Sequence, residues 1–131
     1  MVSKSSPGGS IFPYFYKSGE LFGAHYESFG RREAALLDRM KAEEEFLIQQ
    51  NHPLPYWVNF YGTRLTENVV TEFVQSFRRL EKFIPKLAIV GCSGFGKWRF
   101  ERVRKKLGLK IPVRFFSDPE DAKTWLVDEG Y

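Results

Sequence analysis

Residues 87–98 read Leu87-Ala88-Ile89-Val90-Gly91-Cys92-Ser93-Gly94-Phe95-Gly96-Lys97-Trp98. A short apolar run leads into a glycine-rich loop and then into a helix-forming segment, which predicts a buried strand, a tight turn and a helix. Gly91, Gly96 and Lys97 match the first part of the phosphate-loop pattern G-x-x-x-x-G-K. Trp98 occupies the last position, where a Ser or Thr hydroxyl would hold Mg²⁺. The stretch therefore indicates an α/β fold and poses a choice between an ATPase and a small binding module.

The length of the chain favours the binding module. Its 131 residues are expected to form one domain, whereas P-loop NTPases are usually larger. Hydrolysis also needs a strand that ends in Asp or Glu to organise the metal, but the apolar runs end at Gly62, Gly91 and Ser117. We therefore interpret residues 91–98 as a strand-to-helix turn in which glycine permits a tight reversal.

The hydrophobic periodicity predicts alternating strands and helices. Residues 11–16 and 21–29 predict an aromatic hairpin at a sheet edge, since Pro13 cannot donate a hydrogen bond to a neighbouring strand. Further strands are expected over 56–61, 87–90 and 113–116, and helices over 31–50, 66–83, 96–107 and from 119 onward. This order predicts one α/β domain over residues 11–131, with a mainly parallel sheet of four or five strands, the antiparallel hairpin and about four helices. The Ser-, Gly- and Pro-rich residues 1–10 are expected to form a disordered tail.

Several classes of function find no support in the composition. Cys92 is the only cysteine, so no intramolecular disulfide can form, which fits a cytoplasmic location; without a nearby base it is expected to be buried rather than nucleophilic. No apolar run approaches the roughly 20 residues of a transmembrane helix, and the first ten residues lack the apolar centre of a signal peptide. His25 and His52 stand apart from any cluster of metal ligands. We therefore expect no metal site, no cofactor and no enzymatic activity.

Three segments together resemble a known family. They are Leu87–Phe95 (LAIVGCSGF), Phe115–Leu126 (FFSDPEDAKTWL) and Tyr56–Thr66 with the helix that follows it. In their order and spacing they are similar to the STAS-like proteins, often called SpoIIAA-like, which are related to bacterial anti-sigma-factor antagonists and are small and mostly uncharacterised. The similarity spans roughly residues 11–127. It implies a STAS-like fold and a module that acts through a protein partner or a small anionic or lipidic ligand.

The resemblance also implies a role for the serine in the glycine-rich turn. Antagonist proteins present a phosphoacceptor serine in an Asp-Ser-Ser-Gly-Leu-Gly turn at a helix N-terminus, and Ser93 stands at the matching position here. Gly91 and Cys92 replace the family's acidic residue and neighbouring serine. A phosphate on Ser93 would be favoured by the free N–H groups of the helix, and Lys97 is close enough in sequence to help neutralise it. A small helix-capping residue is the alternative interpretation of Ser93.

Basic charge is concentrated in residues 97–114. This segment holds eight Lys and Arg residues against Glu101 alone, within a chain whose net charge is +4. The helical spacing gathers Arg99, Arg102, Lys105 and Lys106 into a basic patch away from the apolar stripe. Such a patch attracts phosphate-rich partners, and Trp98 is the one neighbouring aromatic residue that offers base stacking. A merely solvated basic helix is the other interpretation.

Three functional hypotheses follow. The first is a non-enzymatic STAS-like regulatory module that acts through a protein partner or a small anionic ligand. The second is a nucleotide- or phosphate-binding protein that uses Gly91, Ser93, Gly94, Gly96 and Lys97 without hydrolysis. The third assigns residues 97–114 to the binding of nucleic acid or an anionic membrane. A homodimer through the aromatic hairpin at 11–29 is a further hypothesis, because exposed aromatic strands tend to pair.

Overall fold

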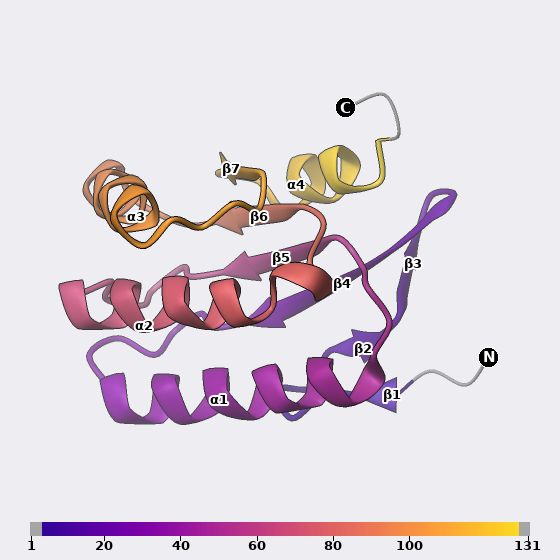
Figure 1. Ribbon diagram of the computed structural model, residues 1–131, viewed down its shortest axis with the longest axis horizontal. Helices are drawn as coiled ribbons and strands as arrows, with labels where there is room; N and C mark the ends of the chain where they lie inside the picture. The colour runs from indigo at the N-terminus through magenta and orange to yellow at the C-terminus, as the bar shows by residue number, and fades with distance from the viewer. Residues whose placement is uncertain (1–3, 129–131) are drawn as a thin grey trace.

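The computed structural model describes residues 4–128, which form one α/β domain around a five-stranded sheet (Figure 1). The strand order is β3-β4-β5-β6-β7, so strands that are consecutive in this series are also neighbours in the sheet. β3 pairs antiparallel with β4, and β4 to β7 are all parallel. The predicted class, a mainly parallel sheet with an antiparallel hairpin, is therefore confirmed. The strand bounds are Tyr14–Tyr16 (β3), Gly19–His25 (β4), Tyr56–Asn59 (β5), Leu87–Val90 (β6) and Val113–Phe116 (β7).

Within the described residues, four α-helices pack on this sheet. α1 (Glu33–Gln50), α2 (Glu67–Arg79) and α3 (Gly94–Leu107) each connect two successive parallel strands, and α4 (Pro119–Leu126) follows β7. A short 3₁₀ segment, η1 (Glu81–Phe83), lies between α2 and β6. No helix in residues 4–128 combines the length and the apolar character that crossing a bilayer requires.

The alternation of side chains along the strands divides the core into two layers. On one face of the sheet, Phe22, Val58 and Ile89 belong to a large cluster with apolar residues of α1, α2 and α3. On the other face, Leu21 lies in a smaller cluster with Trp125 of α4. All four residues of β6 are buried, as expected of a parallel strand with both faces covered.

Aromatic rings hold α2 against the carboxyl ends of two strands. The Phe73 ring on α2 lies 4.9 Å from the Tyr26 ring and 4.9 Å from the Phe60 ring, both in edge-to-face geometry. Tyr26 follows β4 directly, and Phe60 follows β5 directly. Each such pair contributes about 0.5–1.5 kcal/mol beyond its burial. This cluster therefore gives the loops that follow β4 and β5 a rigid base.

Regular structure begins nearer the N-terminus than the sequence predicts. Within the segment expected to be a disordered tail, Lys4–Ser5 forms β1, which pairs antiparallel with β2 (Ile11–Phe12). The backbone N–H of Gly8 donates a 2.6 Å hydrogen bond to the carboxylate of Glu43 on α1. Glu43 is almost fully buried, and this burial raises its pKa. Because the bond joins residues far apart in the chain, local composition does not reveal it.

Pro13 divides the first predicted strand. The strand expected over residues 11–16 is two short strands, β2 and β3, on either side of Pro13, because proline lacks the N–H that a continuous ladder needs. β3 forms one edge of the five-stranded sheet, as expected. Residues 1–3 of the expected tail and 129–131 of the expected domain lie outside the described residues.

The smaller layer depends on a close approach between two strands. A Cβ atom at Gly23 on β4 would lie 2.3 Å from the indole of Trp57 on β5. We expect Gly23→Ala to lower the free energy of unfolding by about 1–3 kcal/mol, because the indole would have to leave its place. Urea denaturation followed by circular dichroism measures this change.

Gly94→Ala is the matched control for this substitution. A Cβ atom at Gly94 meets no neighbouring atom within 4 Å. The free energy of unfolding of the Gly94→Ala variant should therefore equal that of the wild type or exceed it by up to about 1 kcal/mol. An equal loss of stability in the two variants would contradict the packing of Trp57 on Gly23.

Candidate functional site

A polar cleft lies at the carboxyl ends of the parallel strands, the end to which the strand arrowheads point in Figure 1. Its volume is about 740 Å³, and it is bounded by the loops that follow β4, β5 and β6 and by the first turns of α3. Ligands of open α/β sheets generally bind at this end. The lining residues are Gly30, Arg31, Phe60, Gly62, Thr63, Arg64, Leu65, Gly91, Ser93, Phe95, Gly96 and Arg99.

Backbone hydrogen bonds join the loops that form the cleft. The N–H of Gly30 donates to the carbonyl oxygen of Gly62 at 2.8 Å, and the N–H of Arg64 donates back to Gly30 at 2.9 Å. The Arg99 guanidinium on α3 donates to the carbonyl oxygen of Leu65 at 2.6 Å. Three segments that are distant in sequence are thus held in one fixed arrangement.

Gly91 is required by the close approach of Tyr61. Its φ of +79° lies in the left-handed region, and a Cβ atom there would come within 2.7 Å of the Tyr61 backbone nitrogen. The Tyr61 hydroxyl in turn donates a 2.6 Å hydrogen bond to the carbonyl oxygen of Ser117, which follows β7. The glycine therefore lets the loops after β5 and β6 pack directly on one another.

Ser93 caps α3 at the edge of the cleft. Its hydroxyl accepts a 3.2 Å hydrogen bond from the backbone N–H of Gly96, and its side chain is exposed. The helix begins at Gly94, two residues earlier than expected, because this cap satisfies the first turn. The capping interpretation of Ser93 is confirmed. Its exposure also leaves the hydroxyl accessible from the cleft.

Three arginines give the cleft its charge. Arg31, Arg64 and Arg99 line it, and no Asp or Glu is among its lining residues. Arg31 and Arg64 are exposed. Neither side chain forms an ion pair within 4 Å in residues 4–128; hydrogen bonds from Asn68 and Thr66 and, to a smaller extent, the charge of Arg64 lower the pKa of the nearby Glu33 carboxyl. Arg99 is the exception, since its Nε lies 3.4 Å from the carboxylate of Glu67. The cleft therefore carries cationic side chains whose hydrogen-bond donors are available to an anion.

The residues predicted to form one phosphate site do not all lie in the cleft. Gly91, Ser93 and Gly96 line the cleft, whereas Gly94 does not. Lys97 is also outside it, with its ammonium 5.4 Å from the centre of the Phe115 ring on β7. The turn therefore lacks the inward lysine that a phosphate-binding loop needs.

The predicted basic patch on α3 is partly neutralised. Arg102 forms an ion pair with Glu67 on α2, and this contact lowers the pKa of the carboxyl. Lys105 and Lys106 are exposed, as the helical spacing predicts. Arg104 pairs with Glu101 at 2.7 Å. The positive field of α3 is therefore weaker than its sequence suggests.

Sequence reasoning missed the two available arginines of the cleft. Arg31 and Arg64 belong to the loops after β4 and β5, and neither lies near residues 91–98 in the chain. A signal existed in the sequence, because Arg31 directly follows Gly30 and Arg64 lies two residues after Gly62, and each glycine ends an apolar run. Both glycines adopt positive φ in the structure. A glycine there marks a sharp turn at a strand end, where parallel sheets place their binding loops.

Cys92 is an inert neighbour of the cleft. Its side chain packs against the larger core cluster, and burial raises the pKa of its thiol to about 11. Within residues 4–128, no group of three or more His, Cys, Asp or Glu side chains is arranged to hold a metal ion.

Comparisons with protein-family models, curated proteins and solved structures give no match for this chain. The cleft is therefore interpreted from its own residues, and the STAS-like assignment stays a prediction.

The raised pKa of Cys92 predicts slow alkylation. At pH 8 the thiolate is about one part in a thousand in the folded protein, against roughly a quarter for an unperturbed thiol. Reaction with iodoacetamide, followed by mass spectrometry, should be at least about 50-fold slower in the folded protein than in 6 M urea. The rate should rise with pH towards 11. Equal rates in the two states at pH 8 would contradict the burial of this thiol.

Proposed function

We propose that this protein is a non-enzymatic binding module that holds a phosphate-bearing ligand in the cleft at the carboxyl ends of β4, β5 and β6. The observation that carries the proposal is the set of lining side chains, which includes Arg31, Arg64 and Arg99 and no carboxylate. Guanidinium groups bind phosphate through paired, charge-assisted hydrogen bonds. A cleft of this size and polarity accommodates such a ligand with room for its organic part.

The fixed backbone around the cleft supports the same ligand class. The loops after β4 and β5 are hydrogen-bonded to one another, so they need little reordering when a ligand arrives. The first turn of α3, capped by Ser93, lies at the edge of the cleft, and the partial positive charge of a helix N-terminus adds to that of the arginines.

Binding without hydrolysis fits the placement of the remaining residues. Lys97 lies over the Phe115 ring rather than in the cleft, and Trp98 offers no hydroxyl for Mg²⁺. The thiol of Cys92 is protonated at neutral pH because burial raises its pKa. A regulatory role of the STAS-like kind and a cytoplasmic location are parts of the same proposal.

Ser93 supports a second candidate function, regulation through phosphorylation by a protein partner. Its side chain is exposed, and it shares the cleft with Arg31, Arg64 and Arg99. A phosphate on this serine would meet both the helix N-terminus and cationic side chains. Phosphoserine and a free phosphate ligand would then compete for the same cleft.

The test of the proposed function is a titration of the ¹⁵N-labelled protein with inorganic phosphate and pyrophosphate. We expect saturable shifts of the amides of Gly62, Arg64, Ser93 and Gly96, which surround the cleft. Arg64→Gln should weaken pyrophosphate about tenfold or more, because it removes a charged hydrogen-bond donor.

Lys110→Gln is the matched control, because it removes the same charge from an exposed residue that does not line the cleft. Its affinity for pyrophosphate should stay within about twofold of the wild type at 0.15 M salt, where distant charges are screened. Absence of shifts at millimolar ligand, or an equal loss in the two variants, would overturn the proposal.

A further inference from the structure

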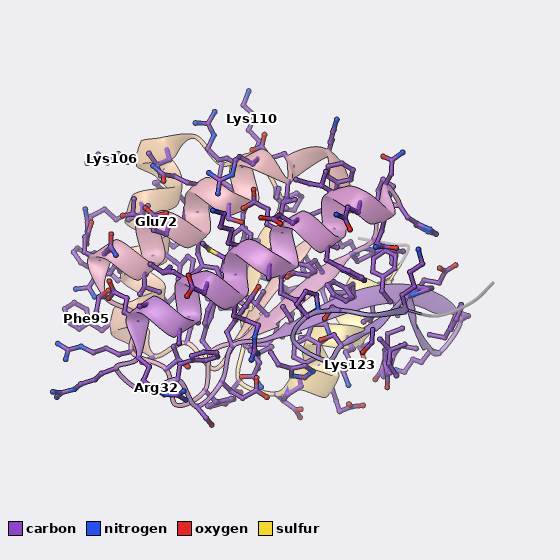
Figure 2. All side chains as sticks on the ribbon, turned by 90° about the horizontal axis from the view of Figure 1, so that it is seen from below. Arg32, Glu72, Phe95, Lys106, Lys110 and Lys123 are labelled. Carbon is purple, nitrogen blue, oxygen red and sulfur yellow. The ribbon has the colours of Figure 1, made fainter. Side chains whose placement is uncertain are left out.

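Two large aromatic side chains are exposed where α3 begins. Phe95 is 68% exposed and Trp98 is 56% exposed, and their ring centres are 6.0 Å apart at an interplanar angle of 34°. Figure 2 shows Phe95 projecting from the side of the molecule. Adjacent exposed aromatic rings cost solvation free energy, and such patches mark interaction sites. Their place beside the cleft makes them a second part of its binding surface, because Phe95 also lines it.

Arginines lie against both rings. The guanidinium carbon of Arg99 is 5.1 Å from the Phe95 ring centre, and that of Arg102 is 5.3 Å from the Trp98 ring centre. We call these four residues the stacking platform. Arg99 belongs to the platform and to the cleft, so the two surfaces are continuous. The platform therefore combines flat apolar faces with positive charge.

We propose that the phosphate-bearing ligand is single-stranded nucleic acid. Unpaired bases stack on Phe95 and Trp98, and a neighbouring backbone phosphate enters the cleft between Arg31 and Arg64. This inference rests on the proposed function and names its ligand class. Aromatic rings interleaved with basic side chains are the usual means of binding single strands without reading their sequence.

The charge around the platform fits a polyanion longer than one phosphate. Beyond the platform, α3 presents Lys105 and Lys106, which are exposed, and Lys110 follows on the loop after the helix. Lys106 and Lys110 both project into solvent in Figure 2. A backbone that leaves the cleft along α3 would therefore keep meeting cations.

The geometry favours single strands over a duplex or a membrane. In a duplex the base faces are stacked on one another, so they cannot reach Phe95 or Trp98. Inserting these rings into lipid would carry the guanidinium groups of Arg99 and Arg102 towards the hydrocarbon, where charge is costly. A base instead stacks on the exposed face of a ring while the arginine stays hydrated and near the phosphate.

Fluorescence anisotropy with labelled ten-residue oligothymidylate and oligouridylate tests the inference. At 50 mM NaCl we expect saturable binding of one or both strands, with an affinity that falls steeply as salt is raised. Trp98→Ala should weaken this binding about tenfold or more, and Trp98→Phe should recover most of the loss because a flat ring remains. A duplex of the same length should bind at least about tenfold more weakly.

Two controls separate stacking from charge and from misfolding. Phe15→Ala removes an equally exposed ring from β3, outside the cleft, and should leave the affinity unchanged. Pyrophosphate binding by Trp98→Ala should also stay unchanged, since Trp98 does not line the cleft, whereas Arg64→Gln should weaken pyrophosphate and oligonucleotide alike.

The outcomes distinguish this inference from the proposed function. Pyrophosphate binding without oligonucleotide binding overturns the nucleic-acid inference alone, and absence of both overturns the two together. Oligonucleotide affinity that Trp98→Ala leaves unchanged, or equal affinity for the duplex, overturns the stacking platform. Trp98-dependent binding to vesicles of phosphatidylcholine and phosphatidylserine, or to polyglutamate, with no binding of single strands would assign the platform to a membrane or an acidic protein instead.

Discussion

The parallel pairing of β4, β5, β6 and β7 places the carboxyl ends of four strands at one edge of the sheet. Every feature of the cleft depends on this alignment, because its walls are loops that leave successive strands. The same pairing sends α1, α2 and α3 back along one face, where their apolar residues form the larger core cluster. Edge-to-face contacts of Phe73 with Tyr26 and Phe60 fix the strand ends at the base of the cleft. The parallel strand pairing thus sets both the position of the cleft and its rigidity.

Small residues let the cleft form without strain. Gly91 allows Tyr61 to approach to a distance that no side chain would permit, and Gly30 and Gly62 adopt the positive φ values that turn the chain at the strand ends. The loops after β4 and β5 are held by their own backbone hydrogen bonds and by Arg99, so the side chains of Arg31 and Arg64 make no structural hydrogen bond within the described residues. Arg31 and Arg64 are consequently available to an external anion, whereas the arginines along α3 are partly committed to Glu67 and Glu101.

Much of the fold was predictable because local signals agreed with the tertiary arrangement. The apolar run 87–90 and the capping Ser93 mark a strand and the start of a helix that the structure contains. The N-terminal segment was misjudged because its order depends on a bond from Gly8 to Glu43, across 35 residues of sequence. Of the five residues that the sequence predicts for an anion site, Gly91, Ser93 and Gly96 line the cleft, whereas Gly94 and Lys97 do not.

The order of the helices and of the parallel strands, their buried faces and the turn at 91–96 follow from local patterns, because periodicity, glycine and capping residues act over a few positions. Which charged groups meet depends on tertiary packing. Lys97 is adjacent to the turn, yet it lies over Phe115, while Arg31 and Arg64 reach the cleft from distant loops. The direction in which a helical side chain points is set by how its helix packs on the sheet, and strand pairing decides which loops lie next to each other. Neither is encoded in the spacing of one motif.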